Sequence, residues 1–348
     1  MIKTIKIGDK EIGNNKDILV QSMTNAKTYD YENTMFQVNE LVSNGCDIVR
    51  VSVPDFESIK SLKKITDKSI VPIVADIHFN YKIAIESIKA GAAKIRLNPG
   101  NIENEWQLQE IIKAANDYNI AIRVGSNSGS LNKNYINKER YIGLAESALN
   151  QVYQLEKHGF FNIVISAKAS SINDNYLANK YIRNRVNYPL HLGITEAGFG
   201  EKGIIKSSMG LGLLLNEGIG ETIRVSLSDD PINEVRVGIE ILKALHLRNG
   251  VDIISCPTCA RTEINVAEFA KKVELWTKEF DKMNQNITIA VMGCVVNGIG
   301  EGKSADIGIA GLKNGAVIFK NGEKIKTVKT SEIEKEFKIQ IEKYIKED

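Results

Sequence analysis

Short apolar runs alternate with longer amphipathic stretches over the first two thirds of the chain. The apolar runs are rich in Val and Ile, have the length of β-strands, and cover residues 18–23, 47–53, 72–78, 93–98, 121–127, 162–168, 190–196 and 222–228. The stretches between them repeat apolar residues at steps of three and four, as helices do, most clearly over residues 138–157. Alternating strands and helices form parallel sheets with right-handed crossovers. Eight such units predict a TIM (β/α)8 barrel, with an open doubly wound sheet as the alternative.

The pattern changes after residue 247, where a short linker at 248–250 is expected. Beyond it the sequence predicts a cysteine-containing segment, a helix over 265–283, a strand over 287–293, a Gly-rich turn, a hairpin turning at Asn321-Gly322 and a charged C-terminal helix. At the other end, a hairpin turning at Gly8-Asp9 is expected to plug the bottom of the barrel. The sequence therefore predicts a barrel of residues 1–247, which binds the substrate, and a small α+β domain of residues 248–348.

Composition and charge exclude several classes of protein. The chain has 348 residues, of which 43% are hydrophobic and 25% charged, so it can bury a core without disulfides. A net charge of +2 gives no overall field for nucleic acid or a membrane surface, and four cysteines are too few for a secreted disulfide scaffold. The N-terminus lacks an apolar signal core, and no apolar run reaches the roughly 18 residues that span a bilayer. We expect a cytoplasmic protein with no nucleic-acid or membrane partner.

Charged and polar residues gather at the carboxyl ends of the predicted strands, where barrels carry their chemistry. These residues are Gln21, Ser22, Arg50, Asp76, His78, Arg96, Asn98, Arg123, Asn127, Lys168, Thr195, Glu196, Arg224 and Ser226. Four strands carry an arginine between apolar neighbours, and a buried arginine is costly unless an anion pairs with it. Structural ion pairs are one explanation, but the acids at these ends are few, chiefly Asp76 and Glu196. We expect a phosphate ester or diphosphate bound by the arginines and Lys168.

Two residues of this group are candidates for proton transfer. Glu196 lies in the segment GITEAGFG, and a carboxyl in a cationic, partly desolvated mouth can exchange a proton near neutral pH. Its alternative role is an ion pair with a nearby arginine. His78 could orient or protonate a substrate oxygen, although a single histidine is more often structural.

Three of the cysteines suggest a metal or redox site. Cys256 and Cys259 form a CxxC motif and Cys294 follows in the Gly-rich turn, whereas Cys46 is expected to be a buried apolar residue. Structural zinc needs a fourth Cys or His ligand, and no histidine follows Cys256. A redox pair would leave Cys294 unexplained. An iron–sulfur cluster accepts three cysteines and a different fourth ligand, which Glu301 could supply. The spacing favours the cluster and leaves zinc and a redox pair open.

Blocks spread over nearly the whole chain resemble the (E)-4-hydroxy-3-methylbut-2-enyl diphosphate synthases, iron–sulfur enzymes of the methylerythritol phosphate route to isoprenoids. The blocks are VQSMTN, GCDIVRVSVPD, PIVADIHFN, KIRLNPGNI, IRVGSNSGSL, GITEAGFGEKGIIKSSMGLG, IRVSLSDDP, SCPTCART and MGCVVNGIGEG. The resemblance implies one [4Fe-4S] cluster held by Cys256, Cys259, Cys294 and Glu301. It also implies a cyclic diphosphate substrate, 2-C-methyl-D-erythritol 2,4-cyclodiphosphate, in contact with Arg50, Asp76, His78, Arg96, Asn98, Arg123, Asn127, Lys168, Thr195, Arg224 and Ser226.

The resemblance further implies a reaction and partners. The reaction is a reductive ring opening with loss of a hydroxyl, Glu196 corresponds to the family's acid/base glutamate, and single electrons come from reduced flavodoxin or ferredoxin. The family forms homodimers in which the cluster domain of one subunit closes over the barrel of the other, and this chain resembles its compact two-domain bacterial type. One alternative is a phosphate-ester-binding barrel synthase with a structural zinc domain, which the lack of a histidine ligand disfavours. Another is a cluster-bearing redox sensor, for which the sequence shows no basic run that would bind a partner.

Overall fold

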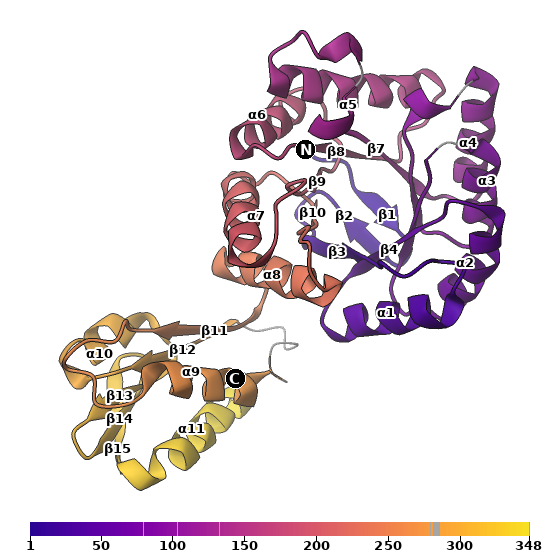
Figure 1. The fold of residues 1–348 in the computed structure, drawn as a ribbon. Helices are drawn as coiled ribbons and strands as arrows, with labels where there is room; N and C mark the ends of the chain where they lie inside the picture. The colour runs from indigo at the N-terminus through magenta and orange to yellow at the C-terminus, as the bar shows by residue number, and fades with distance from the viewer. Residues whose placement is uncertain (79, 103, 132, 279, 281–285, 348) are drawn as a thin grey trace. The chain divides into compact units, whose positions relative to one another are not determined.

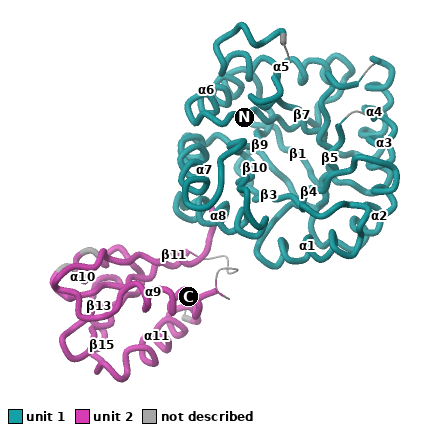
Figure 2. Tube along the Cα trace, in the orientation of Figure 1, with its two compact units in different colours: residues 1–247 teal, residues 248–348 magenta. Residues whose placement is uncertain are grey.

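The computed structural model describes residues 1–347 apart from 79, 103, 132, 279 and 281–285. The chain divides into two compact units, Met1–Leu247 and Arg248–Asp348 (Figure 2). Each unit has a hydrophobic core of its own. Among the described residues, no helix combines the length and the apolar content needed to cross a bilayer.

Unit 1 is a barrel of parallel strands surrounded by helices (Figure 1). The strands are β3 (Leu19–Met23), β4 (Ile48–Ser52), β5 (Ile73–Asp76), β6 (Lys94–Arg96), β7 (Ala121–Asn127), β8 (Ile163–Lys168), β9 (His191–Leu192) and β10 (Thr222–Ile223). Their order is β8-β7-β6-β5-β4-β3-β10-β9, and an isolated parallel bridge between Ile165 and Leu190 joins the two edge strands. The predicted (β/α)8 barrel is therefore confirmed, and the open doubly wound sheet is wrong.

The helices of unit 1 cover the outside of the barrel. In the described part of the chain they are α1 (Tyr31–Ser43), α2 (Phe56–Lys68), α3 (Tyr81–Lys89), α4 (Glu105–Asp117), α5 (Arg140–Lys157), α6 (Ile172–Arg183), α7 (Gly200–Leu215) and α8 (Pro231–Ala244). Several begin at a side chain that accepts a hydrogen bond from the first turn: Asp30, Asp55, Asn80, Ser171 and Asp230. Their apolar faces pack against the strands in one large core.

A hairpin closes the amino-terminal end of the barrel. It consists of β1 (Ile5–Ile7) and β2 (Lys10–Ile12), which pair antiparallel. Its isoleucines pack against apolar residues at the starts of the barrel strands: Leu19, Ile48, Val74, Ala121 and Val164. The predicted plug is therefore confirmed.

Because side chains alternate between the two faces of a strand, each barrel strand can place a charged side chain directly above this apolar layer. Side chains two residues apart on a strand point to the same face of a sheet. Ile48 belongs to the apolar layer, and Arg50 follows it on the same face of β4. The same spacing relates Val74 to Asp76, Ala121 to Arg123, and Val164 to Ser166 and Lys168. One period-2 pattern thus builds both an apolar base and a charged mouth.

Unit 2 is an α+β fold around a five-stranded sheet of order β11-β12-β13-β14-β15. Its elements are β11 (Gly250–Ser255), α9 (Val266–Thr277), β12 (Asn286–Met292), α10 (Val295–Glu301), β13 (Ile307–Leu312), β14 (Gly315–Lys320), β15 (Glu323–Lys329) and α11 (Ile333–Glu347). The first three strands are parallel and the last three antiparallel. Phe269 of α9 and Phe337 of α11 join the core formed by the sheet.

Three local features of the second unit differ from the sequence expectations. Gly250 opens β11 rather than ending a linker, and the chain after α8 takes the left-handed conformation at His246, with φ 54°. The Gly-rich segment after Cys294 contains helix α10, because Gly298 has no side chain and lets the helix lie close to β12 and β13. Helix α9 ends at Thr277, well before the expected residue 283, and residues 281–285 lie outside the described part.

Candidate active site and cysteine loops

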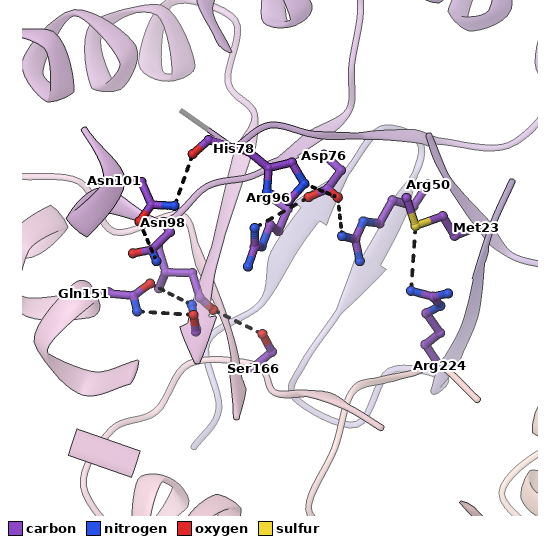
Figure 3. A network of polar contacts seen from close by, with 12 residues as sticks. Met23, Arg50, Asp76, His78, Arg96, Asn98, Asn101, Gln151, Ser166 and Arg224 are labelled. Carbon is purple, nitrogen blue, oxygen red and sulfur yellow. Dashed lines mark hydrogen bonds and ion pairs between the residues drawn. The ribbon is translucent and has the colours of Figure 1, made fainter. Parts of the chain in front are cut away.

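Asp76 is the centre of a cluster of cationic side chains at the carboxyl ends of β4, β5 and β6 (Figure 3). Its carboxylate lies 2.5 Å from Nη2 of Arg50, 3.4 Å from Nε2 of His78 and 3.8 Å from Nη1 of Arg96. Burial raises the pKa of Asp76, but the hydrogen bond from His78 and the charges of the two arginines lower it further, so the pKa ends below its usual range. Asp76 is therefore ionised and orients both arginines toward the mouth.

A second carboxylate lies beside Arg224. Glu234 of α8 is buried, and its Oε2 lies 3.7 Å from Nε of Arg224 and accepts a hydrogen bond from Oγ of Ser22. Nη1 of Arg224 is also 3.7 Å from Sδ of Met23 (Figure 3). Sequence reasoning missed Glu234 because it lies in the first turn of a helix, where an acidic residue is ordinary.

Three further cations in the barrel lack a carboxylate partner among the described residues. Arg123 is 3% exposed, and its Nε and Nη1 have no hydrogen-bond partner. Lys94 is fully buried with an unpartnered Nζ, and Nζ of Lys168 lies 3.3 Å from Nε2 of His191. Burial lowers the pKa of both lysines, and the charges of nearby arginines lower it further. Among the basic residues of this site that the structure describes, ion pairs thus account for Arg50, Arg96 and Arg224, and the basic groups outnumber the carboxylates.

The remaining predicted polar contacts also lie at strand ends. Asn98 follows β6, where its Oδ1 accepts a hydrogen bond from Gly100 and its Nδ2 donates to Asn101 (Figure 3). Asn127 ends β7 in register with Lys168 on β8. Thr195 follows β9 and Ser226 follows β10, both half-buried. The structure therefore places these side chains at one end of the barrel and gives Asn98 an additional role in the local turn.

Glu196 has an unusual backbone conformation. Its φ is 54°, in the left-handed region that non-glycine residues rarely adopt and that is often retained at functional sites. The side chain is exposed, so the partly desolvated surroundings expected from sequence are not seen in this structure. A Cβ at Gly129 would lie only 3.3 Å from Oε1 of Glu196, so the carboxylate packs on that glycine. Within the described residues, no ion pair joins Glu196 to an arginine.

Gln21 is a candidate that sequence reasoning noted only as a strand end. It lies on β3 and is 1% exposed, and neither its amide oxygen nor its amide nitrogen has a partner in the described part of the protein. A buried amide without a partner costs about 1–3 kcal/mol, so such a group is commonly retained to contact a ligand.

Lys94 and His191 were missed because each opens its strand, within an apolar run that otherwise reads as core.

The cysteines of unit 2 lie on loops that follow neighbouring parallel strands. Cys256 follows β11 and Cys294 follows β12, two residues past its end. The backbone N–H of Gly293 donates to Sγ of Cys256 at 3.0 Å, which brings the two loops together. Cys259 is exposed, and its N–H donates to Oγ1 of Thr262 at 3.0 Å. None of these three described cysteines forms a disulfide, while Cys46 is buried in the barrel as expected.

Comparisons with known proteins decide the family. The model of the GcpE TIM-barrel domain matches residues 2–239, and that of the GcpE protein C-terminal domain matches residues 252–343. The chain belongs to the GcpE family. Relatives named 4-hydroxy-3-methylbut-2-en-1-yl diphosphate synthase (flavodoxin) include those of Caldanaerobacter subterraneus subsp. tengcongensis (51% identical, covering 100% of this chain and 98% of the relative) and Clostridium tetani (52%, covering 94% and 95%). The predicted family is confirmed, and with it the prediction of an oxidoreductase of isoprenoid biosynthesis.

Solved structures similar to this GcpE chain confirm the fold of its barrel. The dihydropteroate synthase of Stenotrophomonas maltophilia covers 70% of the chain with a TM-score of 0.52 and 14% identity, and the alignment includes 97% of that chain. The dihydropteroate synthase of Yersinia pestis covers 71% with a TM-score of 0.51 and 11% identity, over 100% of that chain. At such low identity the likeness concerns the fold alone.

The donor set of this GcpE chain fits an iron–sulfur cluster in number and chemical kind. Three cysteines that form no disulfide in the described structure lie on loops at the carboxyl edge of one parallel sheet, and thiolates are the usual ligands of such clusters. In the described residues, no three Cys, His, Asp or Glu side chains are grouped closely enough to hold a metal ion. The backbone of Glu301 ends α10, and its side chain lies outside the described part.

Proposed function

We propose that this enzyme opens the ring of 2-C-methyl-D-erythritol 2,4-cyclodiphosphate by reduction and releases (E)-4-hydroxy-3-methylbut-2-enyl diphosphate. The bond between a ring carbon and a phosphate oxygen breaks, and a hydroxyl leaves as water. Two electrons and two protons are consumed. The observation that carries the proposal is a set of buried basic groups in the barrel, Lys94, Arg123 and Lys168, that have no carboxylate partner among the described residues. The name carried by half-identical relatives supports it.

The arginines and Lys168 are proposed to bind the diphosphate. Arginine forms paired hydrogen bonds with phosphate oxygens, and a buried ammonium adds a strong point charge. Asp76 holds Arg50 and Arg96 in place for this purpose. His78, Asn98, Asn127, Thr195 and Ser226 are proposed as polar contacts to the rest of the substrate, and the unsatisfied amide of Gln21 is added to them.

Glu196 is the proposed acid/base residue. Its left-handed backbone and its packing on Gly129 fix the carboxylate at the mouth. Binding of substrate would cover this exposed group and bring its carboxyl next to the reacting atoms. Glu196 can then supply a proton to the departing hydroxyl or to the carbon skeleton.

Cys256, Cys259, Cys294 and Glu301 are the proposed ligands of one [4Fe-4S] cluster. Such a cluster supplies single electrons, and its differently bound iron can act as a Lewis acid toward a substrate oxygen. The chain's own contribution is to fix the thiols, through the Gly293 bond to Cys256 and the Thr262 bond to Cys259.

The proposed electron donor is reduced flavodoxin, which the relatives' names include, with ferredoxin as the other candidate. We further propose a homodimer, in which the cluster domain of one subunit acts on the barrel of the other. An exposed apolar stripe on α7, formed by Ile205, Met209 and Leu213, is consistent with such an interface. The cytoplasmic location stays a prediction.

The first experiment is anaerobic purification followed by an optical spectrum and by iron and sulfide analysis. We expect broad absorption near ~400 nm and about four irons and four sulfides per chain. Turnover of the cyclodiphosphate with reduced flavodoxin should then be seen in the wild type and be largely lost in Glu196→Gln and Glu301→Ala. Zinc in place of iron, with no cluster after reconstitution, would overturn the reductive reaction and favour a zinc-stabilised barrel synthase.

A further inference from the structure

Lys168 is held by a histidine rather than by a carboxylate. It ends β8 with only 9% of its surface exposed, and Nε2 of His191, on β9, lies 3.3 Å from its Nζ. Within the described residues, no carboxylate lies within ion-pair distance of Lys168. Because its contact is a neutral ring, the Lys168 amine has no anion beside it, and an anion that binds there would favour its charged form.

The hydrogen bonds of His191 have a defined direction when Lys168 is charged. An ammonium group can only donate, so Nε2 of His191 accepts and Nδ1 carries the ring proton. Nδ1 lies 2.8 Å from Oγ1 of Thr222, on the neighbouring strand β10, and donates to it. His191 is fully buried, and burial together with the positive charges of Lys168 and Arg123 lowers its pKa well below the ordinary value. The ring therefore stays neutral and keeps an acceptor toward Lys168.

Gly193 leaves the space that the lysine needs. A Cβ at this position would lie 2.5 Å from Nζ of Lys168 and 2.5 Å from the backbone oxygen of Arg224. No real Cβ approaches other atoms so closely, so any side chain here would displace the ammonium. Gly193 follows His191 by two residues and thus lies on the same side of an extended segment. The ring of His191 and the absence of a side chain at Gly193 therefore both determine where the Nζ of Lys168 lies.

We propose that His191 is a positioning residue that, with Thr222 and Gly193, holds the Lys168 ammonium in place for a phosphate group of the substrate. The proposal rests on the proposed function, which makes Lys168 a phosphate-binding residue. With one N–H directed to His191, the other two N–H groups of the ammonium remain for phosphate oxygens. The competing role is a purely structural contact between β8 and β9.

Calorimetry on the anaerobic holoenzyme separates these two roles. We expect His191→Leu to raise the Kd for the cyclodiphosphate about tenfold, as loss of one hydrogen bond to a charged group would. Steady-state kinetics should show most of the loss in KM, since a phosphate contact acts equally on bound substrate and transition state. His191→Gln, which keeps a side-chain acceptor, should recover most of the affinity. Gly193→Ala should weaken binding in the same way with the histidine intact.

A matched control is Glu221→Gln, which alters a contact at Leu190, the residue that precedes β9. Glu221 accepts a hydrogen bond from the backbone of Leu190 and pairs with Arg183, and none of its described contacts is to Lys168 or to the ring of His191. Glu221→Gln should lower Tm yet leave Kd within about twofold of the wild type. If His191→Leu lowers Tm and leaves Kd unchanged as well, the positioning role is wrong. Should His191→Leu fail to fold, Thr222→Val replaces it, and unchanged affinity there overturns the proposal equally.

The same titrations with inorganic diphosphate separate this inference from the proposed substrate. If the wild type binds diphosphate but not the cyclodiphosphate, the substrate assignment fails. The role of His191 then stands or falls on whether His191→Leu weakens diphosphate binding. If the wild type binds neither anion, both proposals are overturned.

Discussion

At the scale of single residues, the basic side chains inside the barrel outnumber the carboxylates that could balance their charge. Arg123 shows this most clearly, because two of its nitrogens have no partner in the described structure, and burial, followed by the charges of Arg50 and Arg96, lowers its pKa. A group of this kind weakens the fold and strengthens the binding of an anion. Binding and stability should therefore respond to its removal in opposite directions.

Arg123→Met tests this opposition. We expect affinity for the cyclodiphosphate to fall by about 1.5–3 kcal/mol, the range for hydrogen bonds to charged groups. The free energy of unfolding without substrate should stay the same or rise, because a buried uncompensated charge is gone. Calorimetric titration and thermal unfolding measure the two quantities. Arg140→Met, at an exposed position on α5, should change neither.

Asp76 should make stability depend on acidic pH. Folding lowers its pKa below the ordinary value of 3.8, so its ionised form stabilises the native state. This contribution is complete above the unfolded pKa and is lost as pH falls through about 4 toward the lower folded pKa. The difference in unfolding free energy between wild type and Asp76→Asn should thus be constant above about pH 5 and shrink below pH 4. A difference that persists unchanged to pH 2 would contradict this account.

At the scale of elements, two parallel strands and their loops arrange the thiols of unit 2. The segment after β11 is ordered by its own hydrogen bonds: Oγ1 of Thr262 accepts from the N–H of Cys259, and the N–H of Thr262 donates back to the Cys259 carbonyl. A Cβ at Gly293 would lie only 3.0 Å from Cγ2 of Thr262, so the two loops pack closely. The chain's own hydrogen bonds therefore order the loop that carries Cys259.

Thr262→Val should weaken the retention of iron. Valine has nearly the same shape but leaves the N–H of Cys259 without its acceptor, so the loop should hold its thiol less firmly. We expect several-fold faster loss of iron and sulfide to a chelator, followed as decay of absorption, with the fold unchanged by circular dichroism. Thr262→Ser keeps the hydroxyl and should behave like the wild type. Equal loss rates for all three proteins would remove Thr262 from this role.

Elements with a simple periodicity were predictable from sequence, and elements set by close packing were not. Each barrel strand carries an apolar run, and the plug carries alternating isoleucines, so local pattern suffices. Helix α10 escaped prediction because Gly298 serves tertiary packing against β12 and β13 rather than a turn. Strand-end arginines were found since charge interrupts an apolar run, whereas Glu234 and His191 act through partners distant in sequence. Only the fold brings those pairs together.

At the scale of the whole molecule, two units with separate cores should unfold in separate steps. A cluster bound by unit 2 would stabilise that unit alone, because binding to the native state adds free energy only where the ligand lies. Removing iron by anaerobic chelation should lower one of two calorimetric transitions and leave the other in place. Substrate should act on the transition that iron removal does not move. If iron removal and substrate both shift one single transition, the two units do not unfold separately and this prediction is wrong.

The junction between β8 and β9 links ligand binding to the opening of the barrel. Ile165 and Leu190 form an isolated bridge there, whereas the other neighbouring strands share at least two register pairs. Backbone amides at such a junction should exchange with solvent earlier than those of β7 or β4. Lys168 and His191 stand on opposite sides of it, nearer the mouth. A phosphate group that engages Lys168 would therefore slow amide exchange around residues 190–193, and the occupied barrel would be the more tightly closed one.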